Sequence, residues 1–558
     1  MSPEARTETS TGREPSVIVV GGGIAGLATA CYARMSGLRT RVFEKHVLPG
    51  GCCTAWGRDG YVFDYCIEWL TGTAAGNDAN RVWRELGALD GKSITNFEMF
   101  NRVVGADGRE VTFYHDPDRL QRHLLEVSPA DARQIRAFCR DLRRFLAVDV
   151  FPFLVPRPLQ TTRQALAAWA KILPAFALFW RTAATRMESF TGRLRDPLLR
   201  QAFPNIFFQD HETFPLLPYL FNMASAHHGN AGFPQGGSLG LARSIERRYL
   251  DLGGEIRYRT RVERILVEDG RAVGVQLRDG TRHHADHVVS ACDGTTTIYG
   301  MLEGRYTSPV VDRLYGEMLR KPGEVYPGVV SVFVGVDGEF PAETPHSTTY
   351  LLSEEDGAAL PGSAQCSLVV QLRSRYWPGC APPGKSLLHC TYFTDFASWK
   401  ELRRTNRREY RARKQRAADF VRSFLERHHP GVGERVEVVD VATPVTQHRY
   451  TGNFEGSILA WKSFGEADDL VAKLVDRERM RLPGLRGFSM AGQWVAGGGL
   501  IRAASSGRFA AQFLCAELGV PFRAWESEQQ QRPWSPEMLG ELPLLDRKPA
   551  RHDRRNER

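Results

Sequence analysis

The segment from residue 16 to residue 44, SVIVVGGGIAGLATACYARMSGLRTRVFE, constrains the fold of this chain more than any other stretch. It begins with a short apolar run, breaks at three glycines, and continues as an alanine- and leucine-rich run with the periodicity of a helix. A second apolar run follows and ends at an acidic residue, Glu44. The order strand, tight turn, helix, strand predicts the first unit of a parallel α/β sheet.

Three glycines in the turn, Gly21, Gly23 and Gly26, have the spacing G-x-G-x-x-G. Their expected roles are to turn the chain, to let backbone amides approach a pyrophosphate, and to let the helix pack closely on the strand. The N-terminus of the helix supplies further N–H donors to phosphates. Glu44 lies where a carboxylate can accept hydrogen bonds from an adenosine ribose, and an acid there favours a ribose without a 2′-phosphate. The segment therefore predicts a dinucleotide site.

Two further features distinguish this chain from a domain that binds only NAD. A second glycine pair, Gly50-Gly51, follows the acid and leads into an aromatic-rich run that carries Asp64. Near the other end, residues 485–514 read LRGFSMAGQWVAGGGLIRAASSGRFAAQFL, a glycine motif ahead of a helical run. The late GGGLIR lacks the third glycine of a dinucleotide fingerprint, so we expect no separate NAD(P)H domain.

Together these motifs resemble the FAD-containing amine oxidase and phytoene desaturase superfamily. Within it, the chain is most similar to the phytoene desaturase, carotenoid isomerase and retinol saturase branch. The similar stretches are GGCCTAWGRDGYVFD, FPQGGSLGLARSIERRYLDLGGEIRYRTRVERILVEDGRAVGVQLRDG and TPVTQHRYTGNFEGS. The resemblance implies an α/β fold, with a Rossmann-type FAD-binding domain of the glutathione reductase kind and an interleaved α+β substrate domain. FAD is expected to be non-covalent, because the last glycine motif contains no cysteine, although Cys515 follows shortly after.

The resemblance also implies which residues bind FAD. Val262 is expected to contribute its backbone to the adenine. Two positions depart from the superfamily: Cys52 stands where an arginine is common, and Gln493 stands where an acid is usual, but its amide can still bind the ribityl chain or a phosphate. The expected FAD-binding residues are Gly21, Gly23, Ile24, Ala25, Gly26, Glu44, Lys45, Gly50, Gly51, Cys52, Val262, Gly492, Gln493, Gly499 and Leu500.

The motifs divide the chain into interleaved segments, between an N-terminus and a C-terminal tail that are polar and expected to be disordered. The expected segments are residues 1–14 (disordered), 15–100, 233–300 and 462–524 (FAD-binding domain), 101–232 and 301–461 (substrate domain), and 525–558 (tail).

Two patterns within these segments predict local structure. Asp269-Gly270 separates two strand-like runs and predicts a β-hairpin. Residues 101–232 show long helical patterns, whereas VVSVFVGV, STTYLLS and QCSLVVQLRS after residue 301 predict strands of a mixed or antiparallel sheet that could form the floor of a cavity.

Composition narrows the class of protein. With 558 residues, 42% hydrophobic and 25% charged, the chain is long enough for two connected domains of an ordinary globular protein. The net charge of +9 is compatible with an anionic surface, but no basic run interleaved with aromatics indicates nucleic-acid binding. The ten cysteines include no C-x-x-C pair, so no metal site is predicted. Cys52 and Cys53 are interpreted either as small buried side chains under the nucleotide or as a thiol near the flavin.

The chain shows no signal-peptide pattern and no apolar run of about 18 residues, so we expect a cytoplasmic protein. One segment allows membrane association. Residues 151–180 combine Trp169, Trp180 and other apolar residues with Arg157, Arg163, Lys171 and the flanking Arg181, as an interfacial helix would. The alternative is an amphipathic helix pair covering a substrate cavity, and Pro174 argues against one long helix.

The chemistry expected from these features is flavin chemistry on a lipophilic substrate. Electrons would pass between the flavin and the substrate, oxygen, a quinone or another redox protein. His448, Tyr450 and Trp461 precede the last glycine motif and are candidates for a proton-handling role, with ordinary packing an equal alternative. We expect desaturation, saturation or isomerisation of a polyene or isoprenoid-like compound by hydride transfer with flavin N5. The alternatives are a flavin amine oxidase and a flavin-bound scaffold without enzymatic activity.

Overall fold

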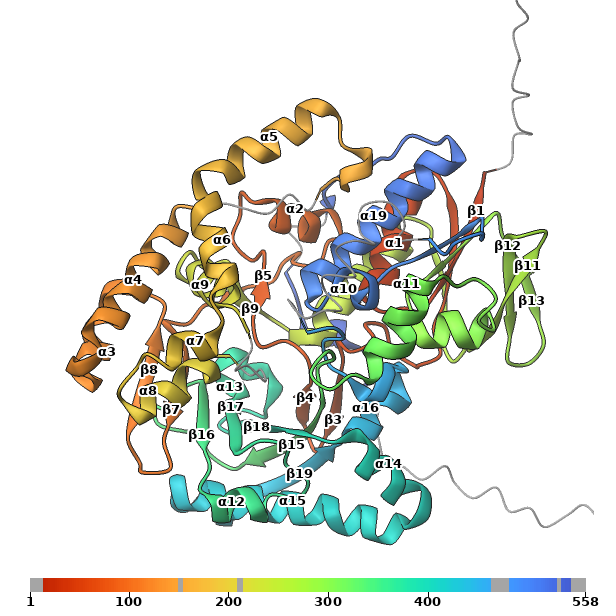
Figure 1. Cartoon of the computed structure of the whole chain (residues 1–558). Helices are drawn as coiled ribbons and strands as arrows, with labels where there is room; N and C mark the ends of the chain where they lie inside the picture. Colours follow the sequence, from red (N-terminus) through yellow and green to blue (C-terminus); the bar gives the residue numbers. More distant parts are fainter. Residues whose placement is uncertain (1–13, 149–153, 208–213, 463–480, 529–532, 543–558) are drawn as a thin grey trace, which may run out of the picture.

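The computed structural model describes residues 14–148, 154–207, 214–462, 481–528 and 533–542 (Figure 1). Its first layer is a parallel sheet of five strands in the order β10-β2-β1-β14-β20. The strands come from the start, the middle and the end of the chain, and every pairing in the sheet is parallel. They are β1 (Ser16–Val20), β2 (Arg39–Phe43), β10 (Glu255–Arg257), β14 (His287–Ser290) and β20 (Phe488–Met490).

Three helices pack together beside this sheet: α1 (Ile24–Met35), α10 (Gly237–Asp251) and α19 (Leu500–Leu518) (Figure 1). The first and last of them are in close contact because Gly507 has no side chain: a Cβ there would lie 2.5 Å from the carbonyl oxygen of Ala25. The predicted unit of strand, glycine turn, helix and strand is confirmed, and the C-terminal helix packs directly on it.

A small antiparallel sheet extends from this layer. It consists of β11 (Val262–Glu268), β12 (Arg271–Leu277) and β13 (Arg282–His284). The turn between the first two strands has positive φ at Asp269 (45°) and Gly270 (70°), as the hairpin signal predicted.

The second large layer is a seven-stranded sheet in the order β19-β15-β18-β17-β16-β7-β8, antiparallel except where β16 pairs with β7. The strands predicted after residue 301 are confirmed as β15 (Gly328–Val336), β16 (Ser347–Leu351) and β17 (Ser367–Leu372), and they are joined by β18 (Ser386–Thr394) and β19 (Val436–Ala442). The expectation of helices throughout residues 101–232 is wrong at its start, because β7 (Met99–Val104) and β8 (Glu110–Tyr114) complete this sheet.

Helices cover both sides of the seven-stranded sheet (Figure 1). The arginine-rich α14 (Phe396–Thr405) and α15 (Arg407–His428) lie along one side and bury Trp399, Val421 and Leu425 against it. A second helical group shares one hydrophobic core with β7 and β8. It comprises α3 (Pro117–Val127), α4 (Ala132–Leu146), α6 (Phe176–Ala184), α7 (Met187–Thr191), α8 (Pro197–Ala202) and α9 (Leu216–His227), with α5 (Thr162–Ile172) preceding α6. Pro174 lies in the break between α5 and α6, as expected.

Further short helices and strands lie between these elements along the chain. They are β3 (Ala55–Arg58), β4 (Tyr61–Asp64), β5 (Leu70–Thr71), α2 (Asp78–Glu85), β6 (Ile94–Thr95), β9 (Ala231–Pro234), α11 (Pro309–Asp312), α12 (Glu354–Ala359), α13 (Arg373–Tyr376), α16 (Pro444–Thr451) and α18 (Gln493–Ala496). Among the residues described, no helix combines the length and the apolar character needed to cross a bilayer.

Part of the expected C-terminal tail is ordered. Trp534 and Leu539 are buried and belong to the same hydrophobic core as the parallel sheet. The indole of Trp534 covers Gly236, where a Cβ would lie 2.4 Å from Cζ2. The polar composition of the tail gave no indication that Trp534 and Leu539 are buried. The surface that Trp534 covers, at Gly236, lies almost 300 residues earlier in the chain.

Candidate cofactor and substrate site

The glycine turn after β1 has the geometry that a bound dinucleotide requires. Gly21 has φ of +101°, and a Cβ at Gly26 would lie only 1.9 Å from the carbonyl oxygen of Gly21. Gly50 also has a left-handed φ, +104°, and donates its N–H to the carbonyl oxygen of Gly22. The two sequence-predicted glycine motifs therefore form one continuous backbone surface at the end of β1.

Two helix N-termini near this surface begin at a glycine. The N-cap of α1 is Gly23 and that of α19 is Gly499, and neither helix has a side-chain cap. The first-turn amides of α1, beginning at Ile24 and Ala25, are therefore available to a phosphate, and those of α19, beginning at Leu500, to another polar group. At most surface helices a Ser, Thr, Asp or Asn would take this role.

Glu44 is buried at the end of β2 and holds two backbone donors. Its carboxylate accepts a hydrogen bond of 2.6 Å from the N–H of Gly22 and another of 2.6 Å from that of His46. Burial raises the pKa of this carboxyl above its ordinary value, and the backbone N–H groups oppose that rise. The carboxylate lies directly beside the glycine turn, where the ribose of a dinucleotide is expected.

Two other residues expected to bind FAD, Lys45 and Val262, also lie at this edge. Burial lowers the pKa of Lys45, whose Nζ lies 3.5 Å from the carbonyl oxygen of Arg449. Val262 is buried at the start of β11, and Thr260 just before it donates its N–H to the carbonyl oxygen of Glu44. This hydrogen bond connects β2 and β11 close to Glu44 and Val262, two of the residues that the resemblance implies for FAD binding.

The Cys-Cys pair contributes packing and hydrogen bonds. Both cysteines are free, and burial raises the pKa of Cys52 to about 12, so its thiol stays protonated at neutral pH. Gln447 and Asn453 donate to its sulfur at 3.1 and 2.9 Å. Cys53 donates its S–H to the carbonyl oxygen of Ser238 at 3.1 Å. This arrangement, with Cys53 buried and Cys52 half-buried, favours the interpretation of two small side chains packed under the nucleotide.

The last glycine motif closes the site from the other side. Gly492 has φ of +109° and donates its N–H to the hydroxyl of Ser506, and Gln493 begins α18 directly after it. The carbonyl oxygen of Trp494 accepts hydrogen bonds from Trp461 Nε1 (2.9 Å) and from the hydroxyl of Tyr315 (2.8 Å). Trp461 is thus a buried support for this motif.

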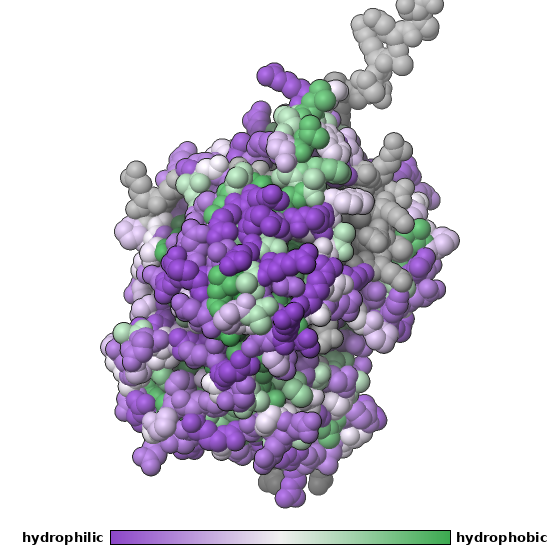
Figure 2. Space-filling view, turned by 60° about the vertical axis from the view of Figure 1, so that its left-hand side comes forward, coloured by the Kyte–Doolittle hydropathy of each residue, from purple (hydrophilic) through white to green (hydrophobic). Residues whose placement is uncertain are grey.

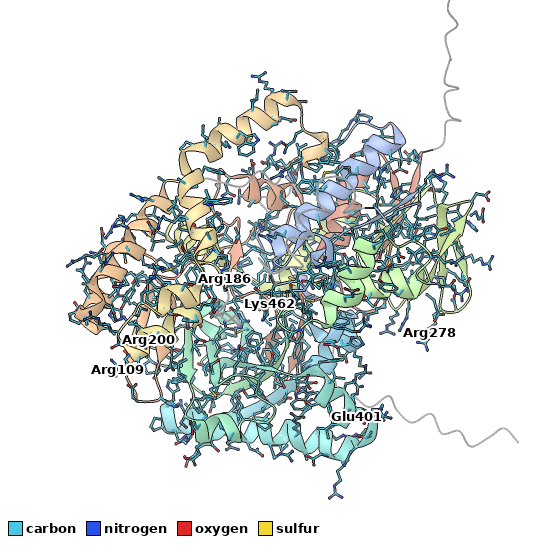
Figure 3. The ribbon with its side chains drawn as sticks, in the orientation of Figure 1. Arg109, Arg186, Arg200, Arg278, Glu401 and Lys462 are labelled. Carbon is cyan, nitrogen blue, oxygen red and sulfur yellow. The ribbon has the colours of Figure 1, made fainter. Side chains whose placement is uncertain are left out.

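The other two candidates for proton handling lie on α16. His448 is exposed, and its Nδ1 is 2.9 Å from the carbonyl oxygen of Asn453. The ring of Tyr450 meets that of His46 edge-on, at 5.0 Å between centroids. Lys462, directly after Trp461, is buried near the middle of the molecule between the two large sheets (Figure 3).

These observations fit FAD. A glycine surface without side chains, two glycine-capped helix N-termini and an acid beside the turn suit a pyrophosphate flanked by a ribose and a ring system. When bound, the flavin supplies hydride acceptance or donation at its N5. The protein residues would hold it in place: Gly23 with Ile24 and Ala25 at the pyrophosphate, Glu44 at the ribose, and Gly492 with Leu500 at the flavin end.

A cavity lies between the seven-stranded sheet and α9. Much of its wall is aromatic, from Trp69, Phe97, Phe100 and Phe207. The pattern of strands predicted a cavity floor, and β7, β16 and β17 provide it. The polar residues of the wall, which sequence reasoning missed, are Glu68, Asn96, Asn101, His115, His346, Ser347, Gln371 and Tyr376.

Glu68 is the acidic group of this wall. Burial raises its pKa to about 7, while Arg373 and a hydrogen bond with Gln371 oppose the rise. It lies in the stretch CIEWLTG, where one acid among apolar residues was the signal that could have identified it. The same loop reaches the turn after Gly50-Gly51, because the N–H of Ile67 donates to the hydroxyl of Ser238 at 2.8 Å and the thiol of Cys53 donates to the carbonyl oxygen of Ser238 at 3.1 Å.

Asp64, at the start of this loop, has a structural role. Its carboxylate accepts from the N–H of Ser238 at 2.5 Å and from the hydroxyl of Ser238 at 2.8 Å. It therefore holds the first turn of α10 against β4, and the serine hydroxyl in turn accepts from the N–H of Ile67.

Comparison with known proteins agrees with this site. The family model described as flavin containing amine oxidoreductase matches residues 24–515. The chain is 24% identical over 536 residues to prolycopene isomerase 1 of an Oncidium hybrid cultivar, covering 92% of this chain and 85% of the relative. It is 25% identical over 480 residues to all-trans-retinol 13,14-reductase of Danio rerio, and the match covers 79% of this chain and 76% of the relative. It is 27% identical over 318 residues to the lycopene-forming phytoene desaturase of Pseudescherichia vulneris, and the match covers 54% of this chain and 60% of the relative.

The fold agrees with a solved structure as well. Cyclohexylamine oxidase from Brevibacterium oxydans has a TM-score of 0.56 to this chain at 14% identity, and the match covers 91% of this chain and 100% of the other. A likeness at that level of identity concerns the arrangement of the sheets and helices, which two proteins can share while their substrates differ.

Proposed function

Because the chain belongs to the family of flavin containing amine oxidoreductases, we propose that it uses bound FAD to act on carbon–carbon double bonds of a lipophilic polyene. Desaturation, saturation and isomerisation are the reactions named by relatives that are 24–27% identical to it. One structural observation supports the proposal: the loop after β4 is joined to the Gly-Gly-Cys-Cys turn through Ser238, which binds both Ile67 and Cys53, and it lines an aromatic cavity through Glu68 and Trp69.

The protein residues then have defined tasks. The aromatic wall buries a planar apolar ligand and excludes water, and flat rings suit an extended conjugated chain. The seven-stranded sheet provides a rigid floor, so the reacting carbon can be held in one position. Hydride transfer needs no pair of catalytic acid and base of the hydrolase type, and the proton that accompanies saturation or isomerisation needs one group that titrates near neutral pH.

The test is an anaerobic titration of the purified, FAD-loaded protein. We expect the oxidised-flavin absorbance to bleach on addition of a partly saturated polyene if the protein is a desaturase. If it is a saturase, chemically reduced protein will instead be reoxidised by the polyene, and an isomerase will convert cis to trans double bonds without net bleaching. Bleaching by primary or secondary amines, with none of these three responses, would refute the proposal in favour of amine oxidation.

The electron acceptor or donor follows from the same experiment. Once the flavin has been reduced by substrate, oxygen, a soluble quinone and a one-electron carrier such as ferricyanide are added separately. The fastest reoxidation identifies the class of acceptor. An isomerase would need none of them, since it transfers no net electrons.

We further propose that α5 and α6 bind a membrane surface. Five of their large apolar residues and of the turn between them are exposed: Leu166 (65%), Trp169 (60%), Leu173 (70%), Phe176 (46%) and Trp180 (71%). Hydrophobic side chains gather at the upper end of the molecule, where α5 lies (Figures 1 and 2). Exposed Arg163 and Lys171 suit anionic headgroups, whereas Arg181 is paired with Asp141 at 2.7 Å.

Sedimentation with phospholipid vesicles tests the membrane contact. The protein should bind vesicles containing phosphatidylglycerol better than vesicles of phosphatidylcholine, and the double variant W169A/W180A should lose most of the binding. The control is W525A, because Trp525 is also exposed (42%) but lies outside these helices. Equal binding by W169A/W180A and by the unsubstituted protein would refute the contact.

A further inference from the structure

The segment TPVTQHRYTGNFEGS, residues 443–457, lies ahead of the last glycine motif in the chain. Its first part is α16, which begins at Pro444 under a capping box between Thr443 and Thr446 and ends before Gly452, whose φ is +80°. Threonine at the cap, proline in the first turn and a left-handed glycine after the last turn are the residues that set the ends of a helix. The chain must therefore leave α16 at Gly452 and turn.

The turn that follows α16 is held by contacts with the rest of the protein. Glu455 has φ of +49°, which is costly for a residue with a side chain, and a Cβ at Gly456 would collide with the carbonyl oxygen of Pro444. Such a conformation persists where the surroundings impose it. One of these contacts is the hydrogen bond of 3.0 Å from the N–H of Phe454 to Asp293 Oδ2, just after β14. The turn is thus fixed to the parallel sheet.

Asn453, at the start of this turn, joins two distant motifs of the cofactor site. Its side-chain Nδ2 donates to Cys52 Sγ at 2.9 Å and to the carbonyl oxygen of Ser457 at 3.2 Å. Its Oδ1 accepts from Trp494 Nε1 at 3.3 Å. Both amide protons and the carbonyl oxygen of this buried side chain are therefore engaged. One amide group connects the turn after Gly50-Gly51 with the last glycine motif, across 401 and 41 residues of chain.

The helix α16 touches the same site at two more places. Gln447 Nε2 donates to Cys52 Sγ at 3.1 Å, so the sulfur receives two amide donors. The carbonyl oxygen of Arg449 lies 3.5 Å from Lys45 Nζ. Cys52 and Lys45 are both among the residues expected to bind FAD. The segment therefore contacts the N-terminal part of the site through α16 and the C-terminal part through Asn453.

A second buried asparagine shows what distinguishes Asn453. Asn101, on β7, donates to Thr349 Oγ1 at 2.7 Å and to the carbonyl oxygen of Asn205 at 3.0 Å, and it accepts from Ser347 at 3.1 Å. It makes as many side-chain hydrogen bonds as Asn453 and is equally buried. None of these three partners is a residue expected to bind FAD. The two asparagines thus differ in what they connect and not in how well they are bonded.

We propose that residues 443–457 form a clasp that retains FAD, and that Asn453 is its positioning residue. Its amide holds the turn after Gly50-Gly51 and the last glycine motif at a fixed separation, so the groups that bind the two ends of FAD are already in place. It acts through Cys52 and Trp494. A preorganised site binds more tightly because less ordering is needed when the ligand enters. This role goes beyond the proposed function, since it applies to any substrate of the flavin.

The rate at which FAD leaves the loaded protein tests the clasp, and the rise of free-flavin fluorescence after dilution measures it. N453L keeps the size of the side chain and removes its hydrogen bonds, and N101L is the matched control. Both variants should melt at a lower temperature, because each leaves buried polar groups unpaired. Only N453L should release FAD faster, by about tenfold.

Substitution of Cys52 tests the same connection with a smaller change, so the test holds even if N453L does not fold. C52A removes the acceptor of the Asn453 amide and should speed FAD release, whereas C52S retains an acceptor in its hydroxyl and should stay close to the unsubstituted protein. The double variant C52A/N453L should release FAD no faster than N453L, because two residues that act as one unit have non-additive effects.

Four results would overturn the clasp. Equal acceleration in N453L and N101L would mean that lost stability alone frees FAD. Unchanged release in N453L or C52A would mean that the connection does not retain the cofactor, and equal release by C52S and C52A would mean that the hydrogen bond is irrelevant. Additive effects of C52A and N453L would show that Cys52 acts on FAD independently of Asn453. The proposed function stands or falls separately, on which compounds react with the flavin.

Discussion

Gly23 and Gly26 belong to one turn, yet the structure assigns them different tasks. A Cβ at Gly26 would collide with the carbonyl oxygen of Gly21 at 1.9 Å, so this glycine permits the helix to pack against the strand. A Cβ at Gly23 would meet no protein atom closer than 4.0 Å, and its φ of −70° suits any residue. The protein itself therefore has no need of glycine at residue 23, which agrees with the proposal that a pyrophosphate approaches the backbone there.

Substitution of Gly23 tests this division of roles. G23A should leave the melting temperature of the apoprotein unchanged and weaken FAD binding at least about tenfold, because the added methyl group occupies the approach to the backbone amides. FAD fluorescence titration and thermal melting measure the two effects. G26A should lower the melting temperature, and G300A is the neutral control because its Cβ would have 4.0 Å of space. Unchanged FAD affinity in G23A would contradict the assigned pyrophosphate position.

Glu68 makes a second prediction at the scale of a residue. Its pKa in the folded protein is about 7 against 4.5 for a free side chain, so folding favours the protonated carboxyl. The folded state is therefore destabilised as pH rises from about 4.5 to about 7. E68Q, which does not ionise, should match the unsubstituted protein below pH 4 and exceed it by on the order of 2–3 kcal/mol above pH 8.

Urea unfolding of both proteins across this pH range measures the difference. Other groups facing Glu68 do not interfere near neutral pH. Burial lowers the pKa of His115 to about 4 and that of His346 to about 3, and it raises that of Tyr376 above its usual range. Arg373 stays charged. The buried Asp64 is the same in both proteins and cancels in the comparison. A difference independent of pH would show that Glu68 does not titrate in this range.

At the scale of elements, helices α1, α2 and α19 are joined by a buried ion pair. Arg508 Nε donates to Glu85 Oε2 at 2.9 Å, and the hydroxyl of Tyr32 donates to the same oxygen at 2.9 Å. The side chains of the pair are only 5% and 1% exposed. A buried charge that loses its partner costs far more than an exposed one, since water cannot replace the lost interaction.

The variant E85Q should therefore lower the free energy of unfolding by about 3–5 kcal/mol, because the Arg508 guanidinium would be left without a counter-charge. Chemical denaturation measures this change. The matched control is E401Q, which breaks the exposed pair between Glu401 and Arg404 and should leave stability unchanged. If the two variants behaved alike, the pair between Glu85 and Arg508 would contribute no more than a surface contact.

At the scale of the whole molecule, distant parts of the chain stabilise one another. The C-terminal segment contributes Trp534, which meets Trp377 edge-on at 5.5 Å between centroids and covers Gly236 at the start of α10. This contact brings the C-terminal segment, α10 and the segment before β18 together in one core. The stability of the parallel-sheet layer thus depends on residues that follow its last helix.

Replacing Trp534 by alanine tests this dependence. W534A should destabilise the protein by about 3–5 kcal/mol through the cavity it leaves, and a melting curve followed by both flavin release and circular dichroism should shift as a whole. W525A is the control, because Trp525 is 42% exposed. A shift in flavin release alone would indicate that the C-terminal segment supports only the cofactor site.

Local signals in the sequence were sufficient for the dinucleotide turn, the hairpin at residues 269–270 and the break at Pro174. Each depends on the backbone preferences of a few adjacent residues, which act in any context. The family was identified from the same kind of evidence, since Glu44, the Gly50-Gly51 pair and the last glycine motif are short and specific.

Tertiary structure alone decided which side chains meet. Glu68, His115 and Gln371 reach one cavity from three elements, and Asn453 binds the sulfur of Cys52 across 401 residues. Strands β7 and β8 escaped prediction because strand pairing depends on a partner that is distant in sequence. By itself, the sequence determined the cofactor and the type of fold, because backbone geometry is local. The polar part of the cavity wall required the folded chain, because hydrogen bonding and burial are properties of residues brought together.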